Sequence, residues 1–160
     1  MNAPDPDDLQ VELRSPARPL HLRPRYLLLV FAGGTLGTAA RAALSLALPA
    51  SGGIPWTILA INVLGAFVLG FLLDDLNRLG PDEGWRRRVR LFGGTGFMGG
   101  FTTYSALATD SASLIGSAEP GLTAAGIFYA LATILVGAAA SWAGIALAGY
   151  RHRIWGRRTV

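Results

Sequence analysis

The stretch "GGTGFMGGFTTYSALATD", residues 93–110, decides how this chain folds. It opens with five glycines in eight residues and continues with a run of hydroxyl side chains, yet it lies in a segment apolar enough to cross a membrane. In hydrocarbon each unpaired backbone N–H or C=O costs several kcal/mol, so a broken helix is tolerated only inside protein or beside a cavity. The stretch therefore predicts a transmembrane helix broken at mid-membrane, with carbonyl oxygens released for a cation.

The composition of the whole chain also indicates a membrane protein. Of its 160 residues 51% are hydrophobic and only 15% are charged, whereas soluble domains carry about 25% charged residues. The apolar residues gather in blocks long enough to span a bilayer, namely residues 26–48, 56–73, 89–115 and 122–147. The expected fold class is an all-α membrane protein with four transmembrane helices, the third of them broken.

Three regions follow from this pattern. Residues 1–25 contain five prolines among scattered charges and are expected to form a disordered cytoplasmic tail. Residues 26–149 form the four-helix transmembrane domain, and residues 150–160 form a basic C-terminal tail. The two histidines, His21 and His152, flank the apolar blocks and are expected to be solvated surface residues.

The basic side chains are placed on one side of the predicted membrane. The chain has no lysine, and thirteen of its fourteen arginines lie in the two tails, in the loop after the second block or at the edge of the third. Positive residues stay in the cytoplasm, so both termini are expected to be cytoplasmic. Because these arginines flank apolar blocks, they indicate contact with membrane lipid, and no nucleic-acid partner is expected.

A few polar side chains fall inside the apolar blocks. Asn62 is the most polar residue of the second block, and an amide at that depth must face protein or a water-filled path. It can serve an interhelical hydrogen bond or line an ion path. Tyr129 and Thr133 share one face of the fourth block, although a helix hydroxyl often bonds to its own carbonyl at i−4. Glycines at helical spacing, such as Gly33 and Gly37, are expected to pack helices closely.

Nothing at membrane depth indicates catalysis. The chain has no cysteine, no nucleotide-binding loop and no HExxH motif, and the charged residues within the blocks are Arg41, Arg90 and Asp110. We expect Arg41 and Asp110 to lie in a vestibule of the transport path or to help set the orientation of the chain in the membrane. The sequence therefore indicates a transport protein and not an enzyme.

Taken in order, these segments resemble the Fluc (CrcB) family of bacterial fluoride channels. The similarity rests on "GGTLGTAAR" in the first block, "PWTILAINVLGAFVLG" in the second and "GFMGGFTTYSAL" in the third, with Tyr129 and Thr133 at the family's polar positions in the fourth. It covers nearly the whole chain after residue 26.

The resemblance implies a passive fluoride channel that exports cytoplasmic fluoride and so lowers its toxicity. Two subunits would pack antiparallel, and the breaks of their third helices would meet at the dimer centre. The backbone oxygens of Gly99 and Thr102 would hold one structural sodium ion there, which is not transported. Fluoride would pass through two pores, which the resemblance lines with Asn62, Tyr104, Ser105, Leu107, Tyr129 and Thr133.

Two positions depart from the family pattern. Tyr104 and Leu107 stand where the family has pore phenylalanines, whose ring edges face the anion. Leu107 has no ring, which leaves open a non-conducting subunit of a heterodimeric channel. A small multidrug-type exporter is the other alternative, although its membrane-buried glutamate is missing from the first block. The arginine asymmetry favours a homologous partner of opposite orientation over a homodimer.

Overall fold

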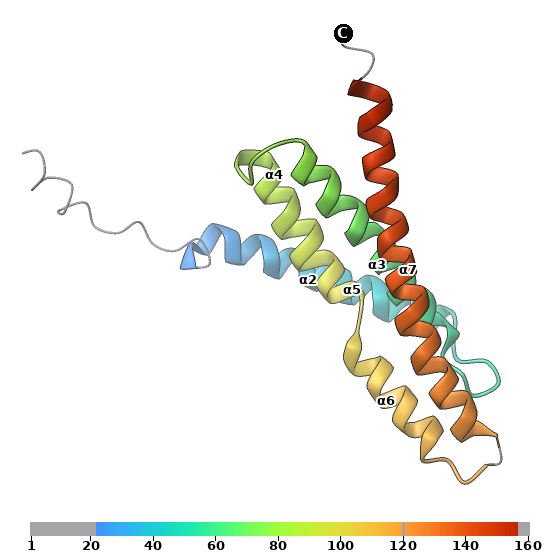
Figure 1. Ribbon diagram of the computed structural model, residues 1–160. Helices are drawn as coiled ribbons and strands as arrows, with labels where there is room; N and C mark the ends of the chain where they lie inside the picture. Colours follow the sequence, from blue (N-terminus) through green and yellow to red (C-terminus); the bar gives the residue numbers. More distant parts are fainter. Residues whose placement is uncertain (1–21, 120, 157–160) are drawn as a thin grey trace, which may run out of the picture.

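The structure, a computed structural model, describes residues 22–119 and 121–156, and every regular element among them is helical. The elements are α2 (Pro24–Ala47), α3 (Trp56–Arg78), α4 (Gly84–Val89), η2 (Arg90–Met98), α5 (Gly99–Phe101), α6 (Tyr104–Ile115) and α7 (Leu122–Gly156). Figure 1 shows their arrangement. The predicted tail at residues 1–21 lies outside the described residues.

Three of these helices are long and apolar enough to cross a membrane: α2, α3 and α7. The remaining crossing of the predicted four is the composite segment η2–α5–α6, which is interrupted at Thr102 and Thr103. Helix α2 begins two residues before the predicted block, because Pro24 suits the first turn of a helix. Helix α7 continues past the fourth block through residues 150–156, which the sequence pattern assigns to the C-terminal tail.

The location of the helix break corrects the sequence prediction. The glycine run stays helical: η2 is a π-helix and α5 continues it as far as Phe101. The chain leaves the helix only at Thr102 (φ −79°, ψ 158°) and Thr103 (φ −152°, ψ 117°). The glycines instead serve close packing, since a Cβ on Gly96 would lie 2.7 Å from the backbone oxygen of Val30 in α2.

The break lets the third segment change its packing partner. Before it, η2 and α5 pack against α2; after it, α6 packs against α7. Helix α3 packs mainly on α7. Figure 1 shows the extended link between α5 and α6 where the direction of the chain changes. The break therefore joins two helix pairs, α2 with η2 and α3 with α7.

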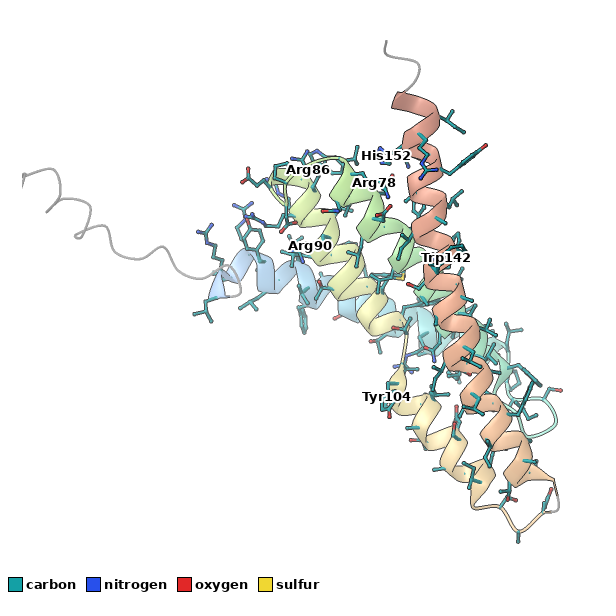
Figure 2. The ribbon with its side chains drawn as sticks, viewed as in Figure 1. Arg78, Arg86, Arg90, Tyr104, Trp142 and His152 are labelled. Atoms are coloured by element: carbon teal, nitrogen blue, oxygen red, sulfur yellow. The ribbon has the colours of Figure 1, made fainter. Side chains whose placement is uncertain are left out.

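Ion pairs fasten the end of the molecule where the arginines gather, labelled in part in Figure 2. Asp75 of α3 is buried, and its Oδ1 lies 3.0 Å from Nε2 of His152 and 3.4 Å from a guanidinium nitrogen of Arg151 in α7. His152 is therefore not the solvated surface residue that we expected. The contacts of the Asp75 carboxylate with His152 and Arg151 hold α3 against α7 at that end.

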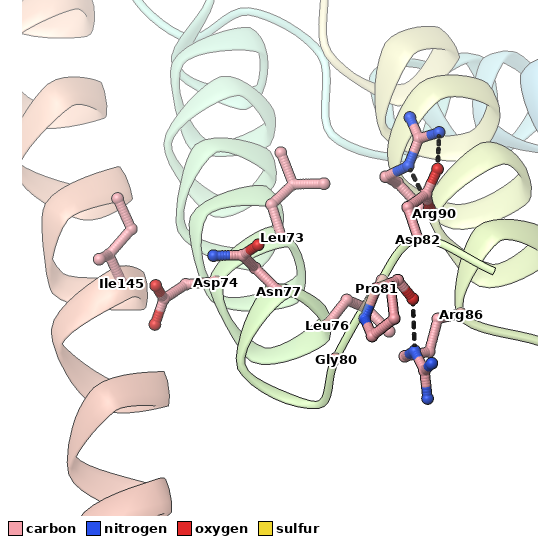
Figure 3. A pocket seen from close by; sticks show the side chains of 10 residues that line it. All are labelled: Leu73, Asp74, Leu76, Asn77, Gly80, Pro81, Asp82, Arg86, Arg90 and Ile145. Atoms are coloured by element: carbon pink, nitrogen blue, oxygen red, sulfur yellow. Dashed lines mark hydrogen bonds and ion pairs between the residues drawn. The ribbon is translucent and has the colours of Figure 1, made fainter.

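The loop between α3 and α4 is fixed by its own contacts, drawn in Figure 3. The Asp82 carboxylate accepts two hydrogen bonds from Arg90, from Nε at 2.9 Å and from a terminal nitrogen at 2.7 Å. Arg86 Nε donates to the Pro81 carbonyl oxygen at 2.8 Å. The hydrogen bond from Arg90 holds the pKa of Asp82 below its usual value.

Candidate functional site

The backbone of the break is paired with one side chain from α3. The N–H of Thr103 donates to Oδ1 of Asn62 at 2.8 Å, and Nδ2 of Asn62 donates to the carbonyl oxygen of Thr103 at 3.1 Å. The Asn62 side chain thus replaces the acceptor that a continuous helix would supply to the Thr103 N–H, and it adds a donor to the Thr103 carbonyl oxygen. A buried backbone group without a partner is costly, so Asn62 stabilises the break, while one of its two amide hydrogens has no acceptor among residues 22–119 and 121–156.

Thr103 also starts the next helix. Its Oγ1 accepts a hydrogen bond from the N–H of Ala106 at 3.1 Å, as an N-cap residue does. Ser105 Oγ lies 3.1 Å from the same oxygen. The neighbouring Tyr104 is 82% exposed and extends away from the chain (Figure 2). The first turn of α6 therefore presents a hydroxyl and an aromatic ring to the exterior of this subunit.

On the other side of the break, α2 contributes two donors. Arg41 Nε lies 3.3 Å and Thr38 Oγ1 lies 3.4 Å from the carbonyl oxygen of Gly100. These contacts place Arg41 beside the broken segment. Gly65 of α3 lies against the Thr102 side chain, so α2 and α3 both reach the break.

Two carbonyl oxygens at the break lose the donors that a continuous helix would give them. They belong to Gly99 and Thr102, because the N–H of Thr103 donates to Asn62 and the N–H of Ala106 donates to Oγ1 of Thr103. Gly99 faces open space, with nothing within 4 Å of a Cβ built on it. Backbone oxygens that have lost their helical donors are the kind of ligand that unwound helices offer to a cation.

The remaining predicted pore residues form a second group, where α6 meets α7. Leu107 is buried in a cluster with Tyr129 and Leu114. The Thr133 hydroxyl donates to the Tyr129 carbonyl oxygen at 2.7 Å, which is the i−4 bond within one helix. The Tyr129 hydroxyl and the Ser111 hydroxyl are buried and have no partner among the described residues. Two unsatisfied hydroxyl donors therefore lie in this part of the subunit.

Asp110 lies in a different setting from both groups. It lines a groove of about 280 Å³ together with residues of the loop before α3 and of the α6–α7 connection, among them Pro55 and Ser117. No hydrogen bond or ion pair joins it to the break within residues 22–119 and 121–156. The structure thus gathers Arg41, Asn62, Thr102 and Ser105 at the break and places Asp110 apart from them.

Sequence reasoning missed Thr103 as the residue that Asn62 holds. The available signal was local: a threonine directly before an apolar helical run is typical of an N-cap. Its pairing with Asn62 joins positions 41 residues apart and has no signature in either segment alone. Thr38 was missed for the same reason.

Comparison with known proteins gives the family. The family model described as CrcB-like protein, Camphor Resistance (CrcB), matches residues 28–145, which include the break and its partners. A relative from Leifsonia xyli subsp. xyli, named fluoride-specific ion channel FluC 2, is 60% identical over 81% of this chain and 87% of its own length. FluC 1 of Cutibacterium acnes is 48% identical over 79% of this chain and 87% of its own, and FluC of Rhizobium meliloti is 36% identical over 76% and 94%.

The family model extends over all four predicted crossings, and the relatives that match most of this chain are named as fluoride-specific ion channels. The chain therefore belongs to the FluC/CrcB family of fluoride-specific ion channels, which are transport proteins and not enzymes.

Proposed function

We propose that this chain is a subunit of a passive, fluoride-selective channel of the bacterial plasma membrane. The observation that carries the proposal is the 60% identity to a relative named fluoride-specific ion channel, extending over 81% of this chain. A negative cell interior drives an anion outward by about 2.3 kcal/mol per charge per 100 mV. Export of fluoride through a pore therefore needs no coupled energy source.

The donors at the break and at the contact of α6 with α7 suit a small anion. Asn62 keeps one amide hydrogen free, and the Ser105 hydroxyl lies at an exposed turn. The Tyr129 hydroxyl is buried without a partner, and donors of this kind attract fluoride without adding a fixed charge. Because Tyr104 and Ser105 face outward, a path built from them is completed by a second subunit.

A structural sodium ion at the break is part of the proposal. Sodium is a hard cation that binds oxygen, and the carbonyl oxygens of Gly99 and Thr102, whose helical donors are diverted, are ligands of the kind it takes. Two oxygens leave its coordination shell incomplete, so a second break must supply the others. The ion would hold two subunits together by charge and takes no part in conduction.

Pairing with a homologous subunit of opposite orientation is favoured by charge. Thirteen arginines against none on the two predicted sides bias this chain to insert with both termini in the cytoplasm. In parallel copies the two breaks could not meet in the manner that the family resemblance implies, so the partner should insert the other way round and carry few positive residues on its termini side. Cysteine labelling at both ends, in cells that express this chain alone, tests this, and equal labelling from both sides would contradict it.

A non-conducting role in such a heterodimer is the second candidate. Leu107 packs against Tyr129 in the core of the subunit and offers no ring edge to an anion. If the partner supplies both pore rings, this chain alone conducts nothing and conduction appears on co-expression. The multidrug-type exporter is disfavoured, because the family matches are to channels and the first block has an arginine where that class needs a glutamate.

Growth in fluoride tests the physiological role. Bacteria that lack their own fluoride channels and express this chain should grow at fluoride concentrations that stop the parent strain, with the larger benefit at acidic external pH, where more HF enters. Chloride at equal concentration serves as the control. Equal fluoride sensitivity with and without the chain, whether alone or with its homologous partner, would contradict the proposed function.

A further inference from the structure

A groove opens between the start of α2 and the start of η2, at the end of the molecule where the arginines gather. Its volume is about 340 Å³. The walls are formed by Leu27, Val30, Leu91 and Thr95, and the mouth by Tyr26, Arg87 and Arg90. Figure 2 labels Arg90 and Arg86 at this end. The groove is therefore apolar along its length and cationic at one end.

One carboxylate, that of Asp82, contacts the arginines at the mouth. Arg90 forms the paired hydrogen bonds with Asp82, whereas Arg87 reaches the same carboxylate only through one contact of 3.4 Å. The Arg25 guanidinium lies 5.1 Å from the centre of the Tyr26 ring. Arg25 therefore lies beside the mouth through its contact with Tyr26, and Arg25 and Arg87 are the two cations there that have no close paired contact with a carboxylate among the described residues.

The apolar part of the groove lies at the depth of the lipid tails. Leu27 is 54% exposed, and it belongs to the first turns of a helix that is apolar enough to cross a membrane. Arginines at such a helix end extend toward the interface while their carbon stems cover apolar surface. An amphiphile with an anionic head and a hydrocarbon tail matches both halves of the groove.

We propose that this groove binds one anionic phospholipid, of the phosphatidylglycerol class, in the leaflet on the arginine side. Its phosphate would lie against Arg25 and Arg87, whose guanidinium groups suit phosphate oxygens. One acyl chain would follow Leu27 and Leu91. A free phosphate ion would leave the apolar walls uncovered, and a second copy of this chain would have to bury these two cations against its own surface.

Native mass spectrometry of the full chain in detergent, titrated with phosphatidylglycerol or phosphatidylcholine of identical acyl chains, tests the proposal. We expect one phosphatidylglycerol per chain to bind at least tenfold more tightly than phosphatidylcholine. Arg25→Gln and Arg87→Gln should each weaken that binding about fivefold. Thr95→Trp keeps every arginine, fills the apolar slot and should also reduce binding.

Two matched variants control for the general effect of charge. Arg88 is exposed on the same short helix as Arg87, and Arg153 is exposed on α7, and neither lines the groove. Arg88→Gln and Arg153→Gln should leave phosphatidylglycerol binding unchanged. The proposal is wrong if both lipids bind equally, if Arg88→Gln acts like Arg87→Gln, or if millimolar inorganic phosphate displaces the lipid from an intact groove. Lipid bound to monomers and absent from dimers would assign the groove to a second copy and would equally overturn it.

Discussion

At the scale of single residues, Asn62 has one observed task and one proposed task. Its amide bonds to the N–H and the C=O of Thr103, and its second amide hydrogen, which has no acceptor among the described residues, is the donor that we propose for an anion. Sequence reasoning treated interhelical bonding and an ion path as alternatives for this residue. The structure shows the interhelical bond, and the remaining hydrogen keeps the ion path as part of the proposed function.

Replacing this amide with an acid tests both tasks. Asn62→Asp keeps the acceptor for the Thr103 N–H but loses the donor and places a negative charge beside the Thr103 carbonyl oxygen. We expect fluoride efflux from liposomes to fall at least tenfold while the protein still assembles. Asn77→Asp is the matched control, because Asn77 is exposed on the same helix and remote from the break. If Asn62→Asp releases fluoride as fast as the wild type, Asn62 has no role in the ion path and only packs α3 against the break.

Thr103 offers a separate test of the break. Thr103→Val removes the oxygen that caps α6 at the Ala106 N–H, which costs about 1 kcal/mol in a typical helix. We expect a lower thermal unfolding midpoint in detergent and recovery in Thr103→Ser, which restores the hydroxyl. Thr109→Val, on an exposed position of the same helix, should leave the midpoint unchanged. If Thr103→Ser unfolds at the same temperature as Thr103→Val, the cap contributes nothing.

At the scale of elements, the contact between α2 and η2 depends on glycine. A Cβ on Gly33 would overlap the backbone oxygen of Phe92, and one on Gly37 would overlap the backbone oxygen of Phe97. These glycines therefore set the distance between the two helices, as small residues do in lipid. The neighbouring Gly34 is different, since its nearest atom would be 3.9 Å away.

The adjacent pair Gly33 and Gly34 makes a matched comparison. Gly33→Ala should destabilise the protein by about 1–3 kcal/mol, because two backbones must move apart. Gly34→Ala should be neutral or slightly stabilising, because alanine favours the helix over glycine. Thermal unfolding followed by circular dichroism measures both. Similar midpoints for the two variants would contradict the packing shown between α2 and η2.

The existence of the broken helix could be predicted from sequence, but its position could not. Lipid forbids unpaired backbone, so a glycine-rich and hydroxyl-rich stretch inside an apolar block must break against protein, and it does. The position at Thr102 and Thr103 depends on Asn62, a partner from another helix. The glycines remain helical because α2 lies close beside them. Asp75 and His152 were missed for the same reason, since only the packing of α3 on α7 brings them together.

At the scale of the whole molecule, the proposed assembly of two subunits around a cation rests on the carbonyl oxygens of Gly99 and Thr102, whose helical donors are diverted. Gly99 has open space around it in the single subunit, so Gly99→Val should leave the fold of the isolated chain intact and prevent the breaks of two subunits from meeting. We expect the dimer fraction in cross-linking to drop, as it should in sodium-free buffer. Gly137→Val, at another open glycine on α7, is the control. Thr102→Val should be milder, because it keeps the backbone oxygen.

The measurement that tests the central claim most directly is anion efflux from liposomes reconstituted with the purified chain, together with its homologous partner if the chain alone is silent. Vesicles loaded with equal concentrations of potassium fluoride and potassium chloride are diluted into a buffer that contains neither fluoride nor chloride. A potassium ionophore is then added, and the release of each anion is followed with a selective electrode. The account predicts rapid fluoride release, chloride release no faster than from protein-free vesicles, and loss of the fluoride signal in Asn62→Asp. Equal release of the two anions, or no fluoride release from either preparation, would contradict it.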